Sequence, residues 1–301
     1  MTTTTDTAPP EVRTLNPTTI ANVRAQSIAA LAEAGVPSPE ADAELLIGHV
    51  LGMSRGAVQA RAISGATLGM EDIMAISDLV GRRSAREPLQ HITGVAAFRS
   101  IELAVGPGVF VPRPETETVV QFAIDALKAV PTEQPRAVDL GTGSGAIALA
   151  MATEVPHARV WGVEVSPQAF VWTKQNFRSI APDNATPVFI DLADALPDLD
   201  GTVDVVISNP PYIPAAAIPR DPEVRLYDPE IALYGGEDGL DIVHNVSSTA
   251  ARLLHPGGTL VIEHGELQAA EIAALLRAAG WHAVATHQDL LHRDRATTAT
   301  R

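Results

Sequence analysis

The chain contains no cysteine among its 301 residues. This excludes disulfide bonds, thiolate metal sites and cysteine nucleophiles, and we expect no other metal site. No apolar run approaches the ~20 residues that span a bilayer, so no membrane partner is expected. The N-terminus, "MTTTTDTAPPEVRTLNPTT", has no apolar segment of the kind found in secretory signals. We expect residues 1–16 to form a disordered tail.

Basic residues are also scarce. The 21 Lys and Arg stand against 36 Asp and Glu, a formal charge of −15. Proteins that bind duplex nucleic acid usually show a basic face, and the densest basic cluster here is the short stretch "GRRSAR". We therefore expect no direct nucleic-acid substrate. The 46% hydrophobic content favours a globular protein with a sizeable core, and the absence of cysteine is compatible with a cytoplasmic location.

The pattern along the chain predicts two folded parts. Residues 17–86 carry apolar residues at helical spacing, which predicts a small N-terminal helical bundle. Residues 87–111 predict a β-hairpin linker. From 112 to 301 strands alternate with helices, which predicts an α/β domain with a doubly wound, mostly parallel sheet. Ligands bind at the carboxyl ends of such strands, so the chemistry is expected just after Leu140, Val165, Asp191 and Asn209.

A glycine-rich loop, "VDLGTGSGAIAL", leads from the first strand of this alternation into a helix. Gly141, Gly143 and Gly145 permit a tight turn and a close approach of a ligand to the backbone. The spacing Gly141-x-Gly143-x-x-Ala146 also satisfies a loose dinucleotide fingerprint. From the loop alone, NAD therefore remains an alternative ligand.

Three acidic residues at strand ends favour a different ligand. Glu164 ends the second strand and is placed to accept hydrogen bonds from ribose hydroxyls. Asp139 precedes the loop, where a carboxylate suits an amino group better than a pyrophosphate. Asp191 ends the third strand and could meet an adenine amino group. Adenosine joined to an amino acid, without phosphate, describes S-adenosyl-L-methionine, which we expect as the cofactor.

The stretch "ISNPPYIP" follows a hydrophobic strand, and its paired prolines end that strand in stiff, extended backbone. Asn209 offers a side-chain carbonyl, and Pro210 offers a backbone carbonyl. Two such acceptors can hold both N–H bonds of a planar –NH2 group, and holding reactants in attack geometry contributes roughly 7–11 kcal/mol. Tyr212 can stack on that group or face a cationic methyl. Amides and adenine N6 present the same group, so this clamp does not discriminate between them.

Together these motifs resemble class I S-adenosylmethionine-dependent methyltransferases that modify planar nitrogens. The further stretches "EPLQHITG", "FVPRPETE", "EVRLYDP", "GGEDGLD" and "IEHGELQ" make the chain, from Ile20 onward, similar to the HemK/PrmC family of peptide chain release factor N5-glutamine methyltransferases. The resemblance implies a class I methyltransferase (Rossmann-like) fold and an N-terminal helical domain that docks the release factor. It also implies methyl transfer to the side-chain amide N5 of the glutamine in the Gly-Gly-Gln motif of class I release factors, which modulates translation termination.

The resemblance also assigns roles to individual residues. The family's acid that binds ribose corresponds to Glu164, and the residue expected near adenine is Leu192, where some members have Trp. Asn209 is expected to face both cofactor and substrate. The family's cofactor loop corresponds to Gly141, Thr142, Gly143, Ser144 and Gly145, and its glutamine-binding motif to Asn209, Pro210, Pro211 and Tyr212.

Two alternatives stay open. The first keeps the chemistry but changes the substrate to a ribosomal-protein glutamine or to adenine N6 in nucleic acid. An enzyme that acts on duplex DNA must flip the base and hold phosphates, and the charge of −15 argues against this. The second alternative is a non-catalytic cofactor-binding protein. The expected oligomeric state is a monomer.

Overall fold

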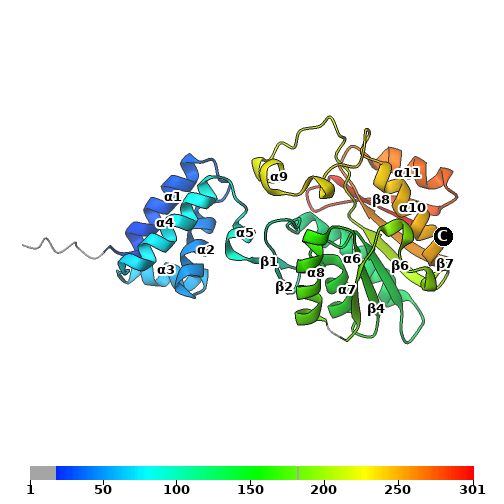
Figure 1. The fold of residues 1–301 in the computed structure, drawn as a ribbon, viewed down its shortest axis with the longest axis horizontal. Helices are drawn as coiled ribbons and strands as arrows, with labels where there is room; N and C mark the ends of the chain where they lie inside the picture. The colour runs from blue at the N-terminus through cyan, green and yellow to red at the C-terminus, as the bar shows by residue number, and fades with distance from the viewer. Residues whose placement is uncertain (1–17, 182) are drawn as a thin grey trace, which may run out of the picture. The chain divides into compact units, whose positions relative to one another are not determined.

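A computed structural model describes residues 18–181 and 183–301 of the chain (Figure 1). The predicted disordered tail, residues 1–16, lies outside the described residues. The chain divides into two units, Met1–Leu89 and Gln90–Arg301. Among the described residues, no helix combines the length and the apolar character needed to cross a membrane.

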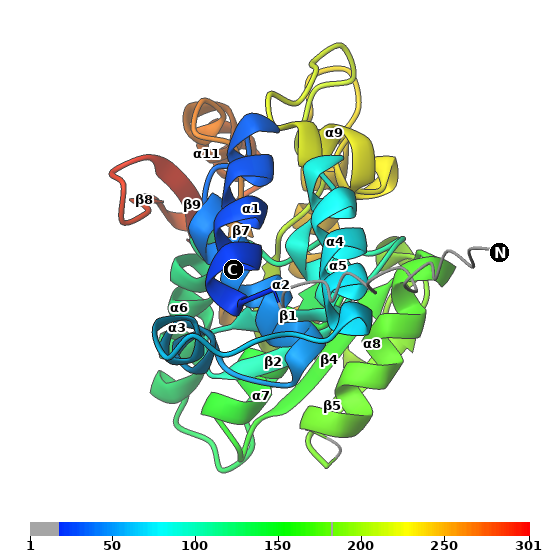
Figure 2. The same ribbon diagram turned by 90° about the vertical axis from the view of Figure 1, so that its left-hand side faces the viewer.

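The described part of the first unit is a helical bundle, as the sequence predicts (Figure 2). Local signals set its helix ends: Ser54 accepts a hydrogen bond from the Ala57 N–H at one helix start, and Gly52 closes another helix in the left-handed conformation. Glu44 is fully buried, and its carboxylate accepts hydrogen bonds from Arg24, Arg55 and Gln59. The helices are α1 (Ile20–Glu33), α2 (Pro39–Leu51), α3 (Arg55–Ile63) and α4 (Met70–Ser84).

The short helix α5 (Leu89–Thr93) precedes the predicted hairpin, which forms as β1 (Val95–Phe98) paired antiparallel with β2 (Ile101–Ala104). The hairpin belongs to the second unit, where it packs on α8 (Pro167–Ile180). Asn176 of α8 accepts a hydrogen bond from the Ala104 N–H and donates one to the Ala104 carbonyl. The hairpin is therefore anchored to the larger unit.

The second unit is built around a seven-stranded sheet in the order β5-β4-β3-β6-β7-β9-β8. The first five strands in this order run parallel, and β9 pairs antiparallel with both β7 and β8. The predicted doubly wound, mostly parallel sheet is thus confirmed. The strands are β3 (Arg136–Leu140), β4 (Arg159–Glu164), β5 (Ala185–Phe189), β6 (Val203–Ser208), β7 (Leu254–Glu263), β8 (His282–Gln288) and β9 (Asp294–Thr300).

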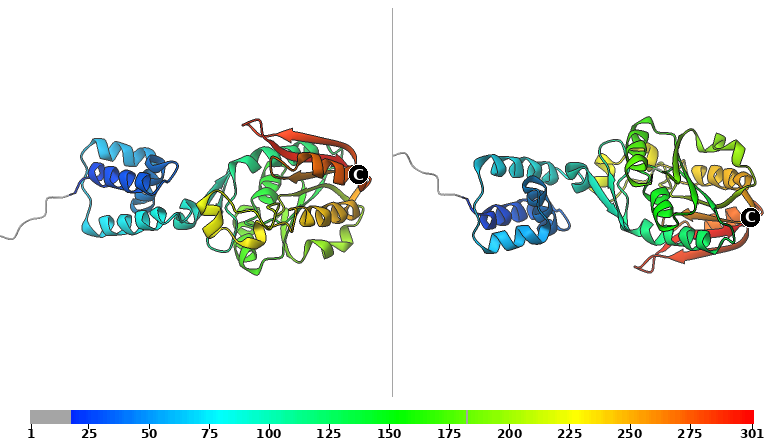
Figure 3. Two further views of the ribbon diagram at one scale, coloured as in Figure 1. Left: turned by 90° about the horizontal axis from the view of Figure 1, so that it is seen from above. Right: turned by 90° about the horizontal axis from the view of Figure 1, so that it is seen from below.

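Helices cover both faces of this sheet (Figure 3). Alternate residues of the central strands point to opposite sides, so Val205 packs with α6 (Pro114–Ala129), α7 (Ala146–Glu154) and α8, while Val206 packs with α10 (Asp241–Leu253) and α11 (Ala269–Ala278). The remaining short helices are η1 (Leu192–Asp194), η2 (Pro197–Leu199), α9 (Pro222–Tyr227) and η3 (Glu230–Ala232).

Candidate active site

A cavity of about 870 Å³ lies at the carboxyl ends of β3, β4, β5 and β6. The strand order reverses between β3 and β6, and such a switch point is where α/β sheets of this kind bind ligands. The volume is within the usual range for small-molecule sites. All four strand ends named from the sequence contribute to its wall, through Gly141, Val165, Asp191 and Asn209.

The glycine loop forms one side of this cavity. Gly141, Gly143 and Gly145 have φ values of +78°, +56° and +92°, a region that residues with a side chain seldom adopt. A Cβ atom at Gly141 or Gly143 would meet no atom within 4 Å, so the backbone there is open to a ligand. Gly145 is different, because a Cβ there would lie 2.8 Å from the Phe177 ring. Thr142 and Ser144 also border the cavity, whereas Gly145 packs against α8.

Asp139 does not border the cavity, which differs from the contact expected for a ligand-binding carboxylate. It is fully buried, and its Oδ2 accepts hydrogen bonds from the Thr142 hydroxyl at 2.6 Å and the Ala148 N–H at 3.2 Å. Burial raises the pKa of this carboxyl to about 7, partly offset by these two hydrogen bonds. Its Oδ1 has no hydrogen-bond partner among the described residues. In this structure, Asp139 therefore supports the glycine loop from the side that faces away from the cavity.

Glu164 both borders the cavity and holds its walls together. Its Oε2 accepts a hydrogen bond from the Gly143 N–H at 2.8 Å, and its Oε1 accepts from the N–H groups of Val165 and Ser166 at 2.9 and 2.7 Å. A carboxylate offers about four lone-pair sites, so acceptor capacity remains for a hydroxyl of a ligand. The carboxylate that is predicted to bind ribose thus also fixes the glycine loop to β4.

Asp191 and Leu192 lie next along the wall, after β5. Asp191 is exposed, and its Oδ1 accepts a hydrogen bond from the Ala193 N–H at 2.9 Å, which caps η1. Leu192 is half-buried. This wall suits an adenosine that carries no phosphate, because it combines an open glycine backbone, the Glu164 carboxylate, and Asp191 next to Leu192. These residues fit S-adenosylmethionine.

The Asn-Pro-Pro-Tyr segment forms the other side of the cavity, which Asn209, Pro211 and Tyr212 border directly. Pro210 is buried and does not border it. Neither the Asn209 side chain nor the Pro210 carbonyl has a hydrogen-bond partner among the described residues. Burial raises the pKa of the Tyr212 hydroxyl to about 12, so the phenol is neutral at ordinary pH. The two acceptors that the sequence analysis assigned to a planar –NH2 group are thus unused within the described fold.

A glycine-rich loop, "GGEDG", fixes the backbone that follows these acceptors. The Ile213 N–H donates to the Leu233 carbonyl, and the Gly235 N–H donates to the Ile213 carbonyl. A Cβ at Gly235 would lie 2.4 Å from the Pro211 carbonyl oxygen, and one at Gly239 would lie 2.3 Å from the Tyr212 carbonyl oxygen. Only glycine permits this close approach between the two segments.

Sequence reasoning did not identify several polar residues of the cavity wall. Arg113 donates a 2.5 Å hydrogen bond to Asp228, and its guanidinium lies 4.8 Å from the centre of the Phe110 ring. This pair joins the "PRPETE" and "YDP" stretches, which are far apart in the chain. Burial raises the pKa of Asp228 to about 6, although Arg113 opposes the rise. Arg113 and Phe110 border the cavity, so the ion pair helps to shape its mouth.

A second unforeseen group lies beside Tyr212. Glu263, at the end of β7, is buried, and this raises its pKa to about 7. The Thr116 hydroxyl and Arg295 act in the opposite direction on that pKa. Thr116 and Arg295 border the cavity, and Arg295 Nε, which lies 3.7 Å from Asp289 Oδ2, makes no hydrogen bond among the described residues. Thr116 belongs to the stretch "PETE" and Glu263 to the stretch "IEHG", but nothing in either stretch predicts that these two residues lie close together.

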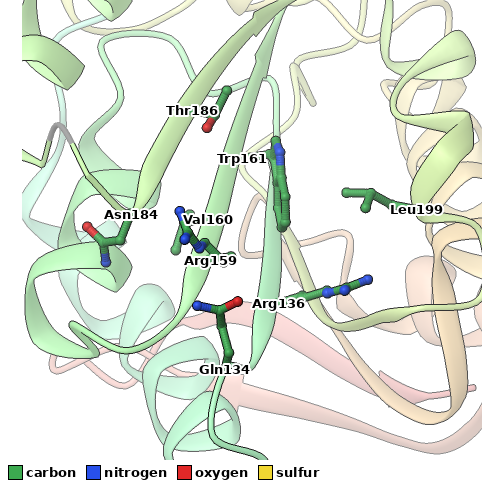
Figure 4. A pocket seen from close by; sticks show the side chains of 8 residues that line it. All are labelled: Gln134, Arg136, Arg159, Val160, Trp161, Asn184, Thr186 and Leu199. Carbon is green, nitrogen blue, oxygen red and sulfur yellow. The ribbon is translucent and has the colours of Figure 1, made fainter.

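A smaller hollow of about 270 Å³ lies near the amino ends of β3, β4 and β5, away from the strand ends that carry the predicted residues (Figure 4). It contains two guanidinium groups, but Arg136 donates to the Thr202 hydroxyl and Arg159 to the Asp183 carbonyl. The Asn184 amide donates to backbone carbonyls, including that of Ala152. Its polar groups therefore serve the fold, and the larger cavity is the candidate active site.

Comparison with known proteins identifies two matching domain families and close relatives. Residues 22–94 match the PrmC N-terminal domain, and residues 101–221 match the methyltransferase small domain. A release factor glutamine methyltransferase from Streptomyces coelicolor is 50% identical over 278 residues, which cover 91% of this chain and 95% of that protein.

A second relative acts on a small molecule according to its name. The 4-amino-L-phenylalanine/4-methylamino-L-phenylalanine methyltransferase of Streptomyces pristinaespiralis is 46% identical over 204 residues, or 67% of this chain and 69% of that protein. Among solved structures, the catalytic domain of hMettl16 in complex with the MAT2A 3'UTR hairpin 6 superposes with a TM-score of 0.52 at 17% identity, covering 66% of this chain and 75% of that one. That likeness concerns the fold alone.

Proposed function

Since the chain belongs to the release factor glutamine methyltransferase family, we propose that it transfers a methyl group from S-adenosyl-L-methionine to the N5 amide nitrogen of the glutamine in the Gly-Gly-Gln motif of class I release factors. The observation that carries this proposal is the Asn209 side chain, which stands at the wall of a cavity of suitable volume and has no hydrogen-bond partner among the described residues; the carbonyl of the buried Pro210, next along the chain, is also unused. Because the substrate is a translation factor, the reaction belongs in the cytoplasm.

The cofactor is held by the glycine loop, Glu164, Asp191 and Leu192. Glu164 accepts a ribose hydroxyl with the lone pair that its three backbone donors leave over. Asp139 acts indirectly, because it braces the loop through Thr142 and Ala148. When bound, S-adenosylmethionine supplies an electrophilic methyl group.

The clamp positions the acceptor nitrogen. Asn209 Oδ1 and the Pro210 carbonyl accept the two N–H bonds of the glutamine amide and aim its nitrogen into the cavity. The neutral Tyr212 ring faces the reacting groups and offers a π surface worth about 0.5–2 kcal/mol to a cation. No strong base is needed before transfer, since the methylated nitrogen is acidic and loses its proton afterwards. Positioning is therefore the main contribution of these residues.

The test is methyl transfer from labelled S-adenosylmethionine to a purified class I release factor. A Gly-Gly-Gln to Gly-Gly-Ala release factor and a duplex DNA serve as controls. Label on the wild-type factor alone supports the proposal. Label on the Gly-Gly-Ala factor would move the target to another residue, and label on DNA would favour the adenine alternative.

An aromatic amine is a second candidate acceptor, favoured by the similarity to the methyltransferase from S. pristinaespiralis. Its amino group is planar, like that of an amide, and the clamp would hold it in the same way. The identity to release factor enzymes covers 95% of the S. coelicolor protein against 69% of the aromatic amine enzyme. We therefore favour the release factor, and 4-amino-L-phenylalanine belongs in the same assay as a competing acceptor.

A further inference from the structure

Gln268 connects the clamp to a part of the chain that has no assigned role. It lies between β7 and α11, and its side-chain Nε2 donates a 2.9 Å hydrogen bond to the Tyr212 carbonyl. Its Oε1 accepts a 3.1 Å hydrogen bond from the Gly265 N–H. Both ends of one amide are thus used, and they join two segments that are more than fifty residues apart in the sequence.

The surroundings of Gln268 leave little room for other arrangements. A Cβ at Gly239 would lie 2.9 Å from Gln268 Nε2, and one at Gly265 would lie 3.0 Å from Gln268 Oε1. The same Cβ at Gly265 would be 3.7 Å from the Tyr212 ring. Two glycines therefore make space for this amide next to the backbone and ring of Tyr212.

Gln268 does not serve α11 as a side-chain cap. It occupies the residue before the helix, yet its side chain makes no capping hydrogen bond to it. The amide instead determines which carbonyl of the clamp segment is occupied. The Tyr212 carbonyl is taken by Gln268, while the Pro210 carbonyl has no partner among the described residues. Without this donor the Tyr212 carbonyl would lose its partner, and the segment could rotate to satisfy it elsewhere.

We propose that Gln268 is a positioning residue for methyl transfer, which fixes the Asn209–Tyr212 backbone through its hydrogen bond to the Tyr212 carbonyl. The inference rests on the proposed function of that segment as an amide clamp. Gln268 touches neither substrate nor cofactor in this assignment. Its effect is on the geometry of attack, where a displacement of about 1 Å can change a rate roughly a hundredfold.

Two variants separate this role from a purely structural one. Gln268→Ala removes both hydrogen bonds. Gln268→Glu keeps an acceptor for the Gly265 N–H and places a negative charge before a helix, where charge of that sign is stabilising, but it loses the donor to Tyr212. A purely structural role predicts that kcat falls in Gln268→Glu only together with the melting temperature, because a carboxylate oxygen then faces the Tyr212 carbonyl oxygen. Gln175→Glu is the matched control, because Gln175 is exposed on α8 and its side chain makes no hydrogen bond among the described residues.

The experiment measures kcat and KM for release factor methylation by the full-length protein, together with calorimetric S-adenosylmethionine affinity and melting temperature. We expect kcat to fall about 10- to 100-fold in both Gln268 variants, with KM, cofactor affinity and melting temperature retained and Gln175→Glu unchanged. Wild-type kcat in Gln268→Glu would overturn the inference, as would loss of cofactor binding or folding in both variants. No methylation by the wild type would instead refute the proposed function and, with it, this role for Gln268.

Discussion

Replacing Asn209 by alanine tests the clamp directly. The Asn209 side chain is half-buried at the cavity wall and has no hydrogen-bond partner among the described residues. A polar side chain that serves folding is normally paired, so its removal should leave the fold intact. We expect the free energy of unfolding to change by no more than about 0.5 kcal/mol, as for substitutions that disturb no buried feature.

The expected kinetic effect follows from one lost acceptor. In Asn209→Ala one N–H of the bound glutamine amide loses its acceptor. An unsatisfied group of this kind costs about 1–3 kcal/mol. At 1.36 kcal/mol for each factor of ten, kcat should fall about 5- to 150-fold. Because the glycine loop and Glu164 are untouched, the affinity for S-adenosylmethionine should stay within about a factor of two, a change of roughly 0.4 kcal/mol.

The assay combines methyl transfer to a release factor with calorimetric titration of the cofactor. Asn245→Ala is the control: Asn245 also borders the cavity, but it is exposed and stands on α10 instead of at the end of β6. We expect little change in its rate. Near-normal turnover by Asn209→Ala would refute the clamp. An equal loss of kcat in both variants would mean that the loss of any polar side chain from the cavity wall slows the reaction.

Three further changes probe the supports of the site. Glu164→Ala removes a carboxylate with charge-assisted hydrogen bonds worth about 1.5–3 kcal/mol each, so calorimetry should show cofactor affinity about 10- to 100-fold weaker; unchanged affinity would count against the ribose assignment. Asp139 keeps its proton in the folded state up to about pH 7, whereas the unfolded chain releases it near pH 4. Its contribution to stability is therefore greatest at low pH and declines by on the order of 4 kcal/mol as the pH rises through this window. Urea unfolding without cofactor should show the Asp139→Asn variant gaining on the wild type between pH 4.5 and 7.5, and a constant difference would contradict the raised pKa. Gly239→Ala should lower kcat and stability because its Cβ meets the Tyr212 carbonyl. Gly257→Ala is the control, because Gly257 has a similar φ of +91° but open space around it. Equal effects of the two substitutions on kcat would show that backbone strain alone is responsible.

The cofactor side of the cavity was largely predictable because its signals are local. The three glycines of the loop have positive φ values and follow directly on a buried strand. Glu164 ends the adjacent strand, and its position at the same sheet edge follows from parallel pairing of β3 and β4. The role of Asp139 was not predictable in the same way. Whether its carboxylate faces a ligand or the Ala148 N–H depends on how α7 packs, which the sequence pattern does not specify.

The substrate side could be predicted only in part. The paired prolines predict that β6 ends in rigid backbone, and the Asn-Pro-Pro-Tyr motif predicts Asn209 as a candidate substrate-binding residue. The groups that support this side come from elsewhere: Gln268 meets the Tyr212 carbonyl across 56 positions, and Arg113 meets Asp228 at the cavity wall across 115. Nothing local marks such pairs, because they arise when separate elements converge on one sheet edge.

Substitutions on the cofactor side and on the substrate side of the cavity should affect different measured parameters. Changes to the glycine loop or to Glu164 act on residues that we propose contact the cofactor, so their effects should appear in cofactor affinity. Changes to Gln268, Gly239 or Arg113 act through side chains that only support the clamp or the mouth of the cavity. Their effects should appear in kcat or in the KM for the protein substrate. If both groups of variants weakened cofactor binding equally, the cavity would be one cooperative unit, and the separation between cofactor loop and amide clamp would have to be abandoned.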